Sequence, residues 1–300
     1  MTFVVVILAL VAAGFFAVAT VAEQHAAYEV PDDSAHGAHL LFTLMRRPLW
    51  WGGFGGNIGG FVVQAVALGL GSLLLVQPLL VTALLFALPL GARWNHRHMA
   101  RADWVWAVLL AVALAIFVVV GQPTRGMARA SITAWLHAAI VIVPCVLACL
   151  LWSATRRRRA SRALPLAIAT GILYGIIAAL TKAVASLVGH GAVAVFTNWE
   201  TYALMVVGIL GVVLQQAAFQ AGSLEASLPA ATVLEPIVAT VLGLTILGET
   251  LRAGGPALVL IGLCVVVVVL GTVALARSAA RFAPEPATAP EPATTQPTAS

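Results

Sequence analysis

The sequence predicts an all-α integral membrane protein, a polytopic transmembrane bundle of about nine helices, and three observations support this. Of its 300 residues, 61% are hydrophobic and 9% are charged, and the mean hydropathy is +1.02. Soluble domains carry about 25% charged residues, so this chain cannot cover its outside with charge. Its apolar residues form continuous runs of about 20 residues, the length of one bilayer-spanning helix. Because the runs do not alternate with polar residues, a β-barrel is excluded.

Nine apolar segments are long enough to cross the bilayer. Each is expected to be a helix, because lipid offers no partner to unpaired backbone groups. The first lacks the basic residues that begin a signal peptide, so we expect it to be retained. Four spans form a first half within residues 1–121, and five form a second half within residues 131–276. The expected spans are 2–22, 49–69, 73–91, 104–121, 131–153, 164–187, 199–221, 226–247 and 256–276.

Two segments are too polar to cross the membrane. Residues 23–48 form a loop, and residues 39–47 at its end are expected to lie along the inner interface as a short amphipathic helix. The loop contains residue types that bind metals, but their spacing matches no closed zinc site. We interpret it as a solvated loop, and whether any metal binds stays unknown. Residues 277–300 form a Pro-rich tail that is expected to be disordered.

The distribution of Lys and Arg predicts the orientation. With the N-terminus outside, twelve of these residues fall on the inner side and three fall on the outer side. The positive-inside rule then predicts a multi-pass protein of the cell membrane with a cytoplasmic C-terminus. The four-arginine run that begins at Arg156 lies between two spans, so we interpret it as a topological anchor in contact with lipid headgroups. Nucleic acid is not an expected partner.

Two stretches of the chain look alike and have opposite predicted orientations. One runs from Gln64 through a Gly-Ser turn to Gln77 and Pro78, and the other runs from Gln216 through a Gly-Ser turn to Glu235 and Pro236. The predicted topology places the first turn outside and the second inside. Inverted repeats are usual in secondary transporters, which bind substrate at the midplane between the halves. We therefore expect two inverted half-bundles, of four and five spans.

These residues resemble the drug/metabolite transporter superfamily, in particular its EamA-type members and the NIPA-type magnesium transporters. The resemblance is carried by Ala226–Pro229, by the Glu-Pro pair at 235–236, by Leu247–Leu251, and by the earlier stretch from Trp50 to Pro78. It implies two inverted halves that give alternating access to a site between them. It implies neither a cofactor nor an enzymatic activity.

The chain departs from that resemblance in two places. EamA-type proteins have ten spans, whereas here the polar loop 23–48 replaces the second span of the first half. Nine spans is the number that the NIPA-type resemblance implies. The closing Gly-Glu of the second half is Gly91-Ala92-Arg93 in the first, so no role of that glutamate carries over there.

Polar side chains at membrane depth are the candidate substrate-binding or ion-binding residues, because their burial costs a few kcal/mol. Glu235 lies near the middle of its span, before a proline that removes one backbone donor. It is either an ion or proton site or a protonated glutamate in a helix–helix hydrogen bond. Lys182 either pairs with Glu235 or with an anionic substrate, or extends its stem to the interface.

Amides on neighbouring spans complete the candidate site. Gln77 occupies the position equivalent to Glu235 in the first half, and Gln64 and Gln216 lie on adjacent spans. Glutamines in spans also bridge helices without any further role. Glu200 and Glu249 are expected near the outer mouth in a solvated setting.

The sequence favours a secondary transporter of a small solute or ion, with membrane lipids as neighbours and a homodimer left open. No Walker A motif or nucleophile elbow is present, so an ATP-driven pump and an enzyme are not expected. A NIPA-like Mg²⁺ transporter is one alternative, although Mg²⁺ prefers several oxygen ligands and the spans offer one deep carboxylate, Glu235. A non-transporting scaffold or envelope assembly factor is the other, and the absence of a polar cavity near Glu235 would favour it.

Overall fold

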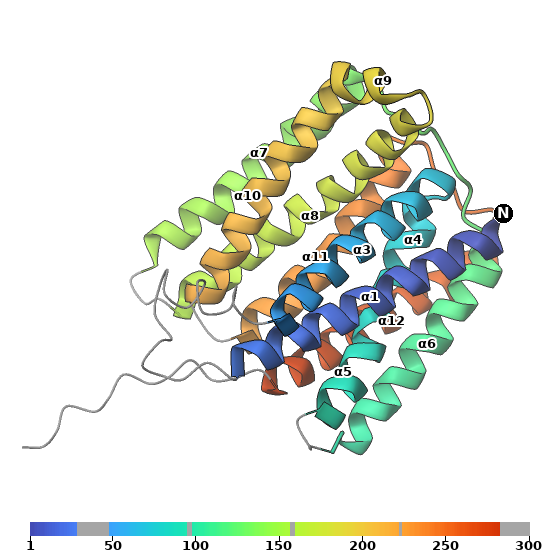
Figure 1. The fold of residues 1–300 in the computed structure, drawn as a ribbon. Helices are drawn as coiled ribbons and strands as arrows, with labels where there is room; N and C mark the ends of the chain where they lie inside the picture. The colour runs from blue at the N-terminus through green and yellow to red at the C-terminus, as the bar shows by residue number, and fades with distance from the viewer. Residues whose placement is uncertain (29–47, 95–97, 157–159, 222–223, 283–300) are drawn as a thin grey trace, which may run out of the picture.

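All regular elements among the described residues are helices. The computed structural model describes residues 1–28, 48–94, 98–156, 160–221 and 224–282 (Figure 1). The helices in this part of the chain are α1 (Thr2–Tyr28), α3 (Pro48–Leu70), α4 (Leu73–Leu80), α5 (Ala83–Trp94), α6 (Arg101–Gly121), α7 (Ile132–Thr155), α8 (Ala160–Val188), α9 (Ala192–Thr197), α10 (Trp199–Ala221), α11 (Leu224–Thr245) and α12 (Pro256–Phe282).

Nine helical segments within the described residues have the length and apolar composition of a membrane span. The prediction of an all-α class and of nine spans is therefore confirmed, and the chain is a multi-pass membrane protein. The bounds of the spans differ from the expected ones by a few residues. The identity of the membrane and the side that faces the cytoplasm stay predictions.

Successive spans run in opposite directions, so the connections collect at two ends of the bundle. We call the end that carries Met1 the N-terminal end (upper right in Figure 1). It also holds the turn 71–72, the loop 122–131 and the loop 246–255. Because nine is an odd number of crossings, Phe282 lies at the opposite end.

The third predicted span is not one continuous helix. Residues Leu73–Trp94 together have the length of a span, but α4 ends at Leu80 and α5 begins at Ala83. At the break, the backbone N–H of Thr82 donates to the carbonyl of Leu79 at 3.0 Å, as does its hydroxyl at 2.6 Å. Pro78 precedes the break and has no N–H. Eight residues of helix cover about 12 Å, which places the break near the middle of a hydrocarbon core of about 30 Å.

Two predicted boundaries were wrong because helices continue into polar sequence. The polar loop was expected to begin at residue 23, but α1 continues to Tyr28, and α12 continues beyond residue 276 to Phe282. Both extensions carry the helix out of the apolar layer. A helix can continue into polar sequence because its backbone hydrogen bonds are formed within the helix itself. The predicted amphipathic helix at 39–47 and the tail from residue 283 lie outside the described residues.

The two predicted halves interlock. The closest helix pairs include α1 with α3 in the first half and α8 with both α10 and α11 in the second. Further contacts join the halves, because α6 and α5 both pack on α12, α3 packs on α8, and α4 packs on α11. The fourth span of the first half is thus covered by the last span of the second.

Small residues permit the closest approach, between α1 and α3. Gly52, Gly56 and Gly60 are spaced four residues apart on α3, and small residues at this spacing let helices approach closely. Gly56 and Gly60 do face α1, where a Cβ would lie 3.2 Å from the Ala19 side chain and 2.8 Å from the Phe16 ring. Gly52 faces open space, and Gly53 takes its place against Glu23.

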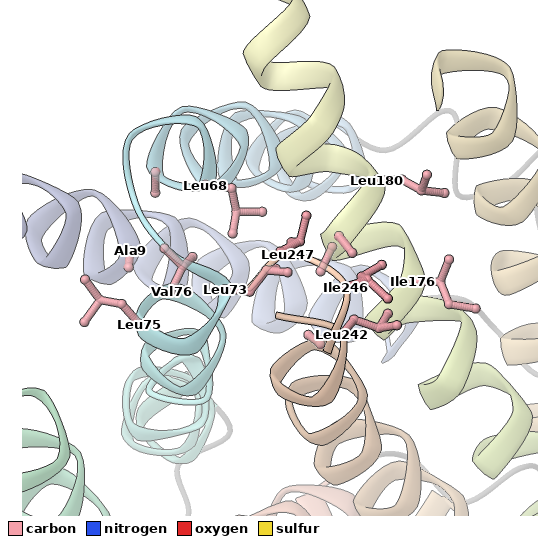
Figure 2. Close-up of a cluster of buried hydrophobic side chains, with 14 of the residues drawn as sticks. Ala9, Leu68, Leu73, Leu75, Val76, Ile176, Leu180, Leu242, Ile246 and Leu247 are labelled. Atoms are coloured by element: carbon pink, nitrogen blue, oxygen red, sulfur yellow. The ribbon is translucent and has the colours of Figure 1, made fainter. Parts of the chain in front are cut away.

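A buried apolar cluster lies where helices of both halves meet. Figure 2 shows that it draws side chains from α1, α3, α4, α8 and α11. Leu73 and Leu247 are 0% and 1% exposed, and they lie toward the N-terminal end. This cluster surrounds the polar site described next.

Candidate functional site

Lys182 and Glu249 form an ion pair that is buried near the N-terminal end of the bundle. Their side chains are 1% and 0% exposed, and the ammonium donates to the Glu249 carboxylate. The ammonium also donates to the backbone carbonyl of Arg125 at 3.1 Å. The pair joins α8 to the loop that follows α11, which are 67 residues apart.

This ion pair corrects three expectations from the sequence. The predicted pairing of Lys182 with Glu235 is wrong, because Glu249 occupies that role. The alternative in which the lysine stem reaches the interface is also wrong, since the side chain is buried. Glu249 is not solvated. A buried charge is stable only when it is paired, and here each side chain provides the opposite charge for the other.

The same glutamate holds the first turn of α4. One oxygen of its carboxylate accepts the backbone N–H of Leu73 at 2.8 Å, and the other accepts that of Leu74 at 2.9 Å. The first N–H groups of a helix have no partner within the helix, and the helix dipole favours a negative charge there. A carboxylate of the second half therefore caps the broken span of the first half.

That contact also establishes the relative direction of two spans. Glu249 follows the C-terminal end of α11 and binds the N-terminal end of α4, so these ends lie together and the two spans are antiparallel. The turn 71–72 that precedes α4 and the N-terminal end of α11 consequently lie at opposite ends of the bundle.

Two loops close over the ion pair. The loop after α6 and the loop after α11 form an antiparallel bridge between Pro123 and Leu251. Gly126 adopts a positive φ of 47°, and a Cβ there would lie 2.5 Å from the carbonyl oxygen of Leu247. Three backbone hydrogen bonds join the loops: Thr124 N–H to Thr250 O at 2.8 Å, Met127 N–H to Leu247 O at 2.7 Å and Arg252 N–H to Gly121 O at 3.1 Å.

A second ion pair lies at the same end. The guanidinium of Arg129 donates to Glu200 at 2.7 and 2.9 Å and to the side-chain oxygen of Asn198 at 2.7 Å. Glu200 was expected to be solvated, but it is 1% exposed. Beside it, the rings of Trp135 and Trp199 meet edge to face with their centroids 6.0 Å apart. This cluster attaches the loop after α6 to the start of α10.

Glu235 lies in a different place, in the middle of α11 and half-buried. It is close enough to Tyr174 of α8 to interact with it electrostatically. The hydroxyl of Tyr174 is hydrogen-bonded to the side-chain oxygen of Gln215 on α10. Tyr174 of α8 is thus close to Glu235 of α11 and bonded to Gln215 of α10.

The predicted amides do not converge on one site. Gln77 is 1% exposed, and its amide nitrogen has no hydrogen-bond partner among the described residues. Gln64 is 7% exposed on α3, whereas Gln216 is exposed on α10. Gln215, one residue earlier, is the glutamine of α10 that faces α8.

A pocket lies between α4, α6, α11 and α12, and its rim includes the exposed side chains of Ile237, Val241 and Val265. Its volume is about 160 Å³, and Pro78 and Pro236 both line it. The other lining side chains are apolar apart from the hydroxyls of Thr240 and Thr272, and the second of these donates to a carbonyl of its own helix. Neither Gln77 nor Glu235 lines this cavity. The pocket around the two prolines is therefore apolar.

A group of three or more metal-binding side chains does not occur within the part of the chain that the structure describes. Glu249 and Glu200 are each already paired with a basic side chain, Lys182 and Arg129 respectively. The magnesium alternative gains no ligand cluster from these residues.

Comparison with known proteins places the chain in a family. An uncharacterized protein of Corynebacterium glutamicum is 36% identical to it over 274 residues, which cover 91% of this chain and 94% of that protein. The chain belongs to the family of this corynebacterial protein. The sequence similarity extends over both halves of the bundle, because it covers 91% of the chain and neither half is that long. No protein-family model matches the chain, and no solved structure matches it.

In this family member, sequence reasoning missed Glu249 and Tyr174 as site residues. The signal for Tyr174 was present, since a phenolic hydroxyl at membrane depth needs a partner. The signal for Glu249 was weaker, because this residue follows the apolar run and has the local sequence of a solvated span end. Its burial depends on Lys182, which reaches it from another helix.

Proposed function

We propose that this protein is a secondary transporter of a small solute, related in architecture to the drug/metabolite transporter superfamily that its sequence resembles. The observation that carries the proposal is the cavity shared by Pro78 and Pro236. These prolines belong to two antiparallel spans, at equivalent positions of the two stretches that look alike. Transporters with inverted repeats place their substrate site at such an interface.

The broken span supports the same proposal. A span that serves only as an anchor is best continuous, because each unpaired backbone group in lipid costs several kcal/mol. The break between α4 and α5 lies at membrane depth and faces protein rather than lipid, with Gln77 and Thr82 buried beside it. Discontinuous helices are the usual way in which transporters bring backbone groups to a substrate.

The buried ion pair is the gate of this transporter. Lys182, Glu249 and the two loops seal the N-terminal end of the bundle above the cavity. Glu249 also joins the broken span to the second half through the Leu73 and Leu74 N–H groups, so withdrawal of its carboxylate would release the start of α4. We therefore assign to Lys182 and Glu249 the role of a gate that opens when the start of α4 moves away from the Glu249 carboxylate.

A transport assay with proline variants tests the proposal. The purified protein is reconstituted in liposomes and screened for uptake of amino acids and divalent cations, with and without a proton gradient. For the solute that is taken up, we expect Pro78→Ala combined with Pro236→Ala to lower the rate about tenfold or more, because continuous helices resist the bending that transport requires. Pro144→Ala is the matched control, since Pro144 lies inside α7 on an exposed face. Equal rates in all three proteins would remove the prolines from the mechanism.

A scaffold or assembly factor is the second candidate, and the apolar lining of the cavity favours it. Thiol accessibility separates the two candidates. In a background without Cys145, Cys149 and Cys264, a Thr240→Cys variant places a thiol on the cavity wall. A transporter exposes this wall to water during its cycle, so we expect a membrane-impermeant maleimide to label the variant within minutes. A scaffold keeps the wall dry, and a variant that stays unlabelled for hours in intact vesicles from either side would favour it.

A further inference from the structure

A pocket lies at the N-terminal end, above the gate. Its volume is about 410 Å³, which is in the range of small-molecule sites. The start of α1, the turn between α3 and α4, and the two loops that close over the ion pair form its walls. The residues of the wall used below are Ser72, Gln122, Arg125 and Arg252.

The charged side chains of this pocket are both arginines. Arg125 and Arg252 line it, and no acidic side chain does so among its described lining residues. Arg252 is exposed, and within the described part of the chain its guanidinium makes no hydrogen bond or ion pair. The nearby acids are already occupied, because Glu249 pairs with Lys182 and Glu200 pairs with Arg129. The pocket therefore presents positive charge that no acidic side chain of the described residues neutralises.

Neutral hydrogen-bond donors complete the wall. The Ser72 hydroxyl oxygen accepts the N–H of Leu75 at 3.2 Å, which leaves its own hydrogen free to donate. Gln122 adds a side-chain amide and has φ 39°, the one positive φ of a non-glycine residue in the described chain. Such backbone strain persists where the surrounding structure requires it. Arginines together with neutral donors are the groups that bind carboxylates and phosphates.

We infer that this pocket binds an oxyanion, the carboxylate or phosphate group of a small molecule. The further statement that this group belongs to the transported solute, which docks here before the gate opens, rests on the proposed function. A phosphate of a lipid headgroup presents the same chemistry to the two arginines, and the experiment below separates the two sources.

The pocket is connected to the gate through one residue. The guanidinium of Arg125 donates to the carbonyl of Gly69, at the end of α3. The backbone carbonyl of the same residue accepts the hydrogen bond from Lys182. An anion that draws the Arg125 guanidinium away from Gly69 pulls on the backbone that holds the lysine. Occupancy of the pocket is thereby linked to the Lys182–Glu249 pair and to the start of α4.

Phosphate binding to the full-length protein tests the inference directly. The protein in phosphatidylcholine nanodiscs is titrated with inorganic phosphate at constant ionic strength, and binding is followed by calorimetry. We expect saturable binding that Arg252→Gln weakens about tenfold or more, because hydrogen bonds between charged groups contribute that much. The Arg252 side chain has no other described partner, so this variant should fold normally. Arg101→Gln at the opposite end is the matched control and should bind phosphate as the wild type does.

A second arm identifies the source of the anion. In nanodiscs with phosphatidylglycerol, a lipid site would abolish phosphate binding, and native mass spectrometry would show a retained lipid that Arg252→Gln loses. A solute site would leave phosphate binding unchanged in both lipids. The inference is overturned if the wild type binds neither phosphate nor phosphatidylglycerol, or if Arg252→Gln binds them equally well. The proposed function fails separately: phosphate binding without transport of any solute would leave the pocket in place and remove the transporter.

Discussion

Replacing Glu249 by glutamine is expected to lower the free energy of unfolding by about 3–5 kcal/mol, the usual cost of leaving a buried charge without its partner. In the variant, Lys182 stays buried with a carbonyl of Arg125 and a neutral amide as its neighbours. The amide also has one oxygen in place of two, so it cannot accept both the Leu73 and the Leu74 N–H groups. One of these buried donors is then left without an acceptor, which costs about 1–3 kcal/mol and forms part of the total.

Unfolding in mixed detergent and dodecyl sulfate micelles, followed by tryptophan fluorescence, measures this loss. Asp103→Asn is the control, because Asp103 caps the start of α6 at an exposed position with one contact of 3.2 Å, where the expected loss is below about 1 kcal/mol. The double variant Lys182→Met with Glu249→Gln should be more stable than Glu249→Gln alone, since no unpaired charge remains. If Glu249→Gln matched the stability of the wild type, the pair would not be charged and the assigned gate would lose its basis.

Alanine at both Gly171 and Gly175 is expected to lower the free energy of unfolding by about 2–6 kcal/mol, since forcing extra atoms into a packed interface costs about 1–3 kcal/mol at each site. A Cβ at Gly175 would lie 2.6 Å from the Cβ of Val238, and one at Gly171 would lie 2.7 Å from the Cβ of Leu234. Both contacts are with the Cβ atoms that stand directly on α11, so no side-chain rotation relieves them. Helices α8 and α11 must therefore move apart.

The matched control is Gly208→Ala in α10, where the new methyl group would meet no atom within 4 Å. Alanine at this position favours the helix by about 1 kcal/mol relative to glycine, so the Gly208→Ala variant should be at least as stable as the wild type. The same micelle assay compares the three proteins. A double variant as stable as Gly208→Ala would show that α8 and α11 are not in close contact, and the position of Glu235 between them would have to be revised.

These two expected results concern different parts of the proposed transporter. The first tests the seal at the N-terminal end, where Glu249 is paired with Lys182 and also binds the start of α4 in the first half. The second tests the interface of α8 and α11, which places Glu235 beside Tyr174. If only one of these variants lost stability, the result would show whether the seal or the α8–α11 interface stabilises the protein.

The spans themselves could be read from the order of residues. A helix satisfies its own backbone hydrogen bonds in lipid, so a run of about 20 apolar residues leaves little choice of structure. Nine such runs correspond to the nine candidate spans within the described residues. The break in the third span could not be read in this way. Prolines also occur inside the continuous helices α7 and α8, as Pro144 and Pro165, so the presence of Pro78 did not distinguish a broken span from an intact one.

Partners within the membrane depended on tertiary contacts. Lys182 and Glu235 were the conspicuous charges of the spans, and their pairing was the natural prediction. The lysine instead meets Glu249, because the loop after α11 folds back over α8 and brings a carboxylate to the start of α4. In the same way, the choice between Gln215 and Gln216 depends on the rotation of α10 about its axis, which packing against α8 decides.

Hydropathy thus determines which segments cross the membrane, since each segment solves that problem with its own backbone. The arrangement of charges in the interior follows from contacts between segments that are 57 to 176 residues apart, and no local pattern records such contacts. A buried charge is stable only beside its partner, so the partner of Lys182 became known when the helices were placed side by side.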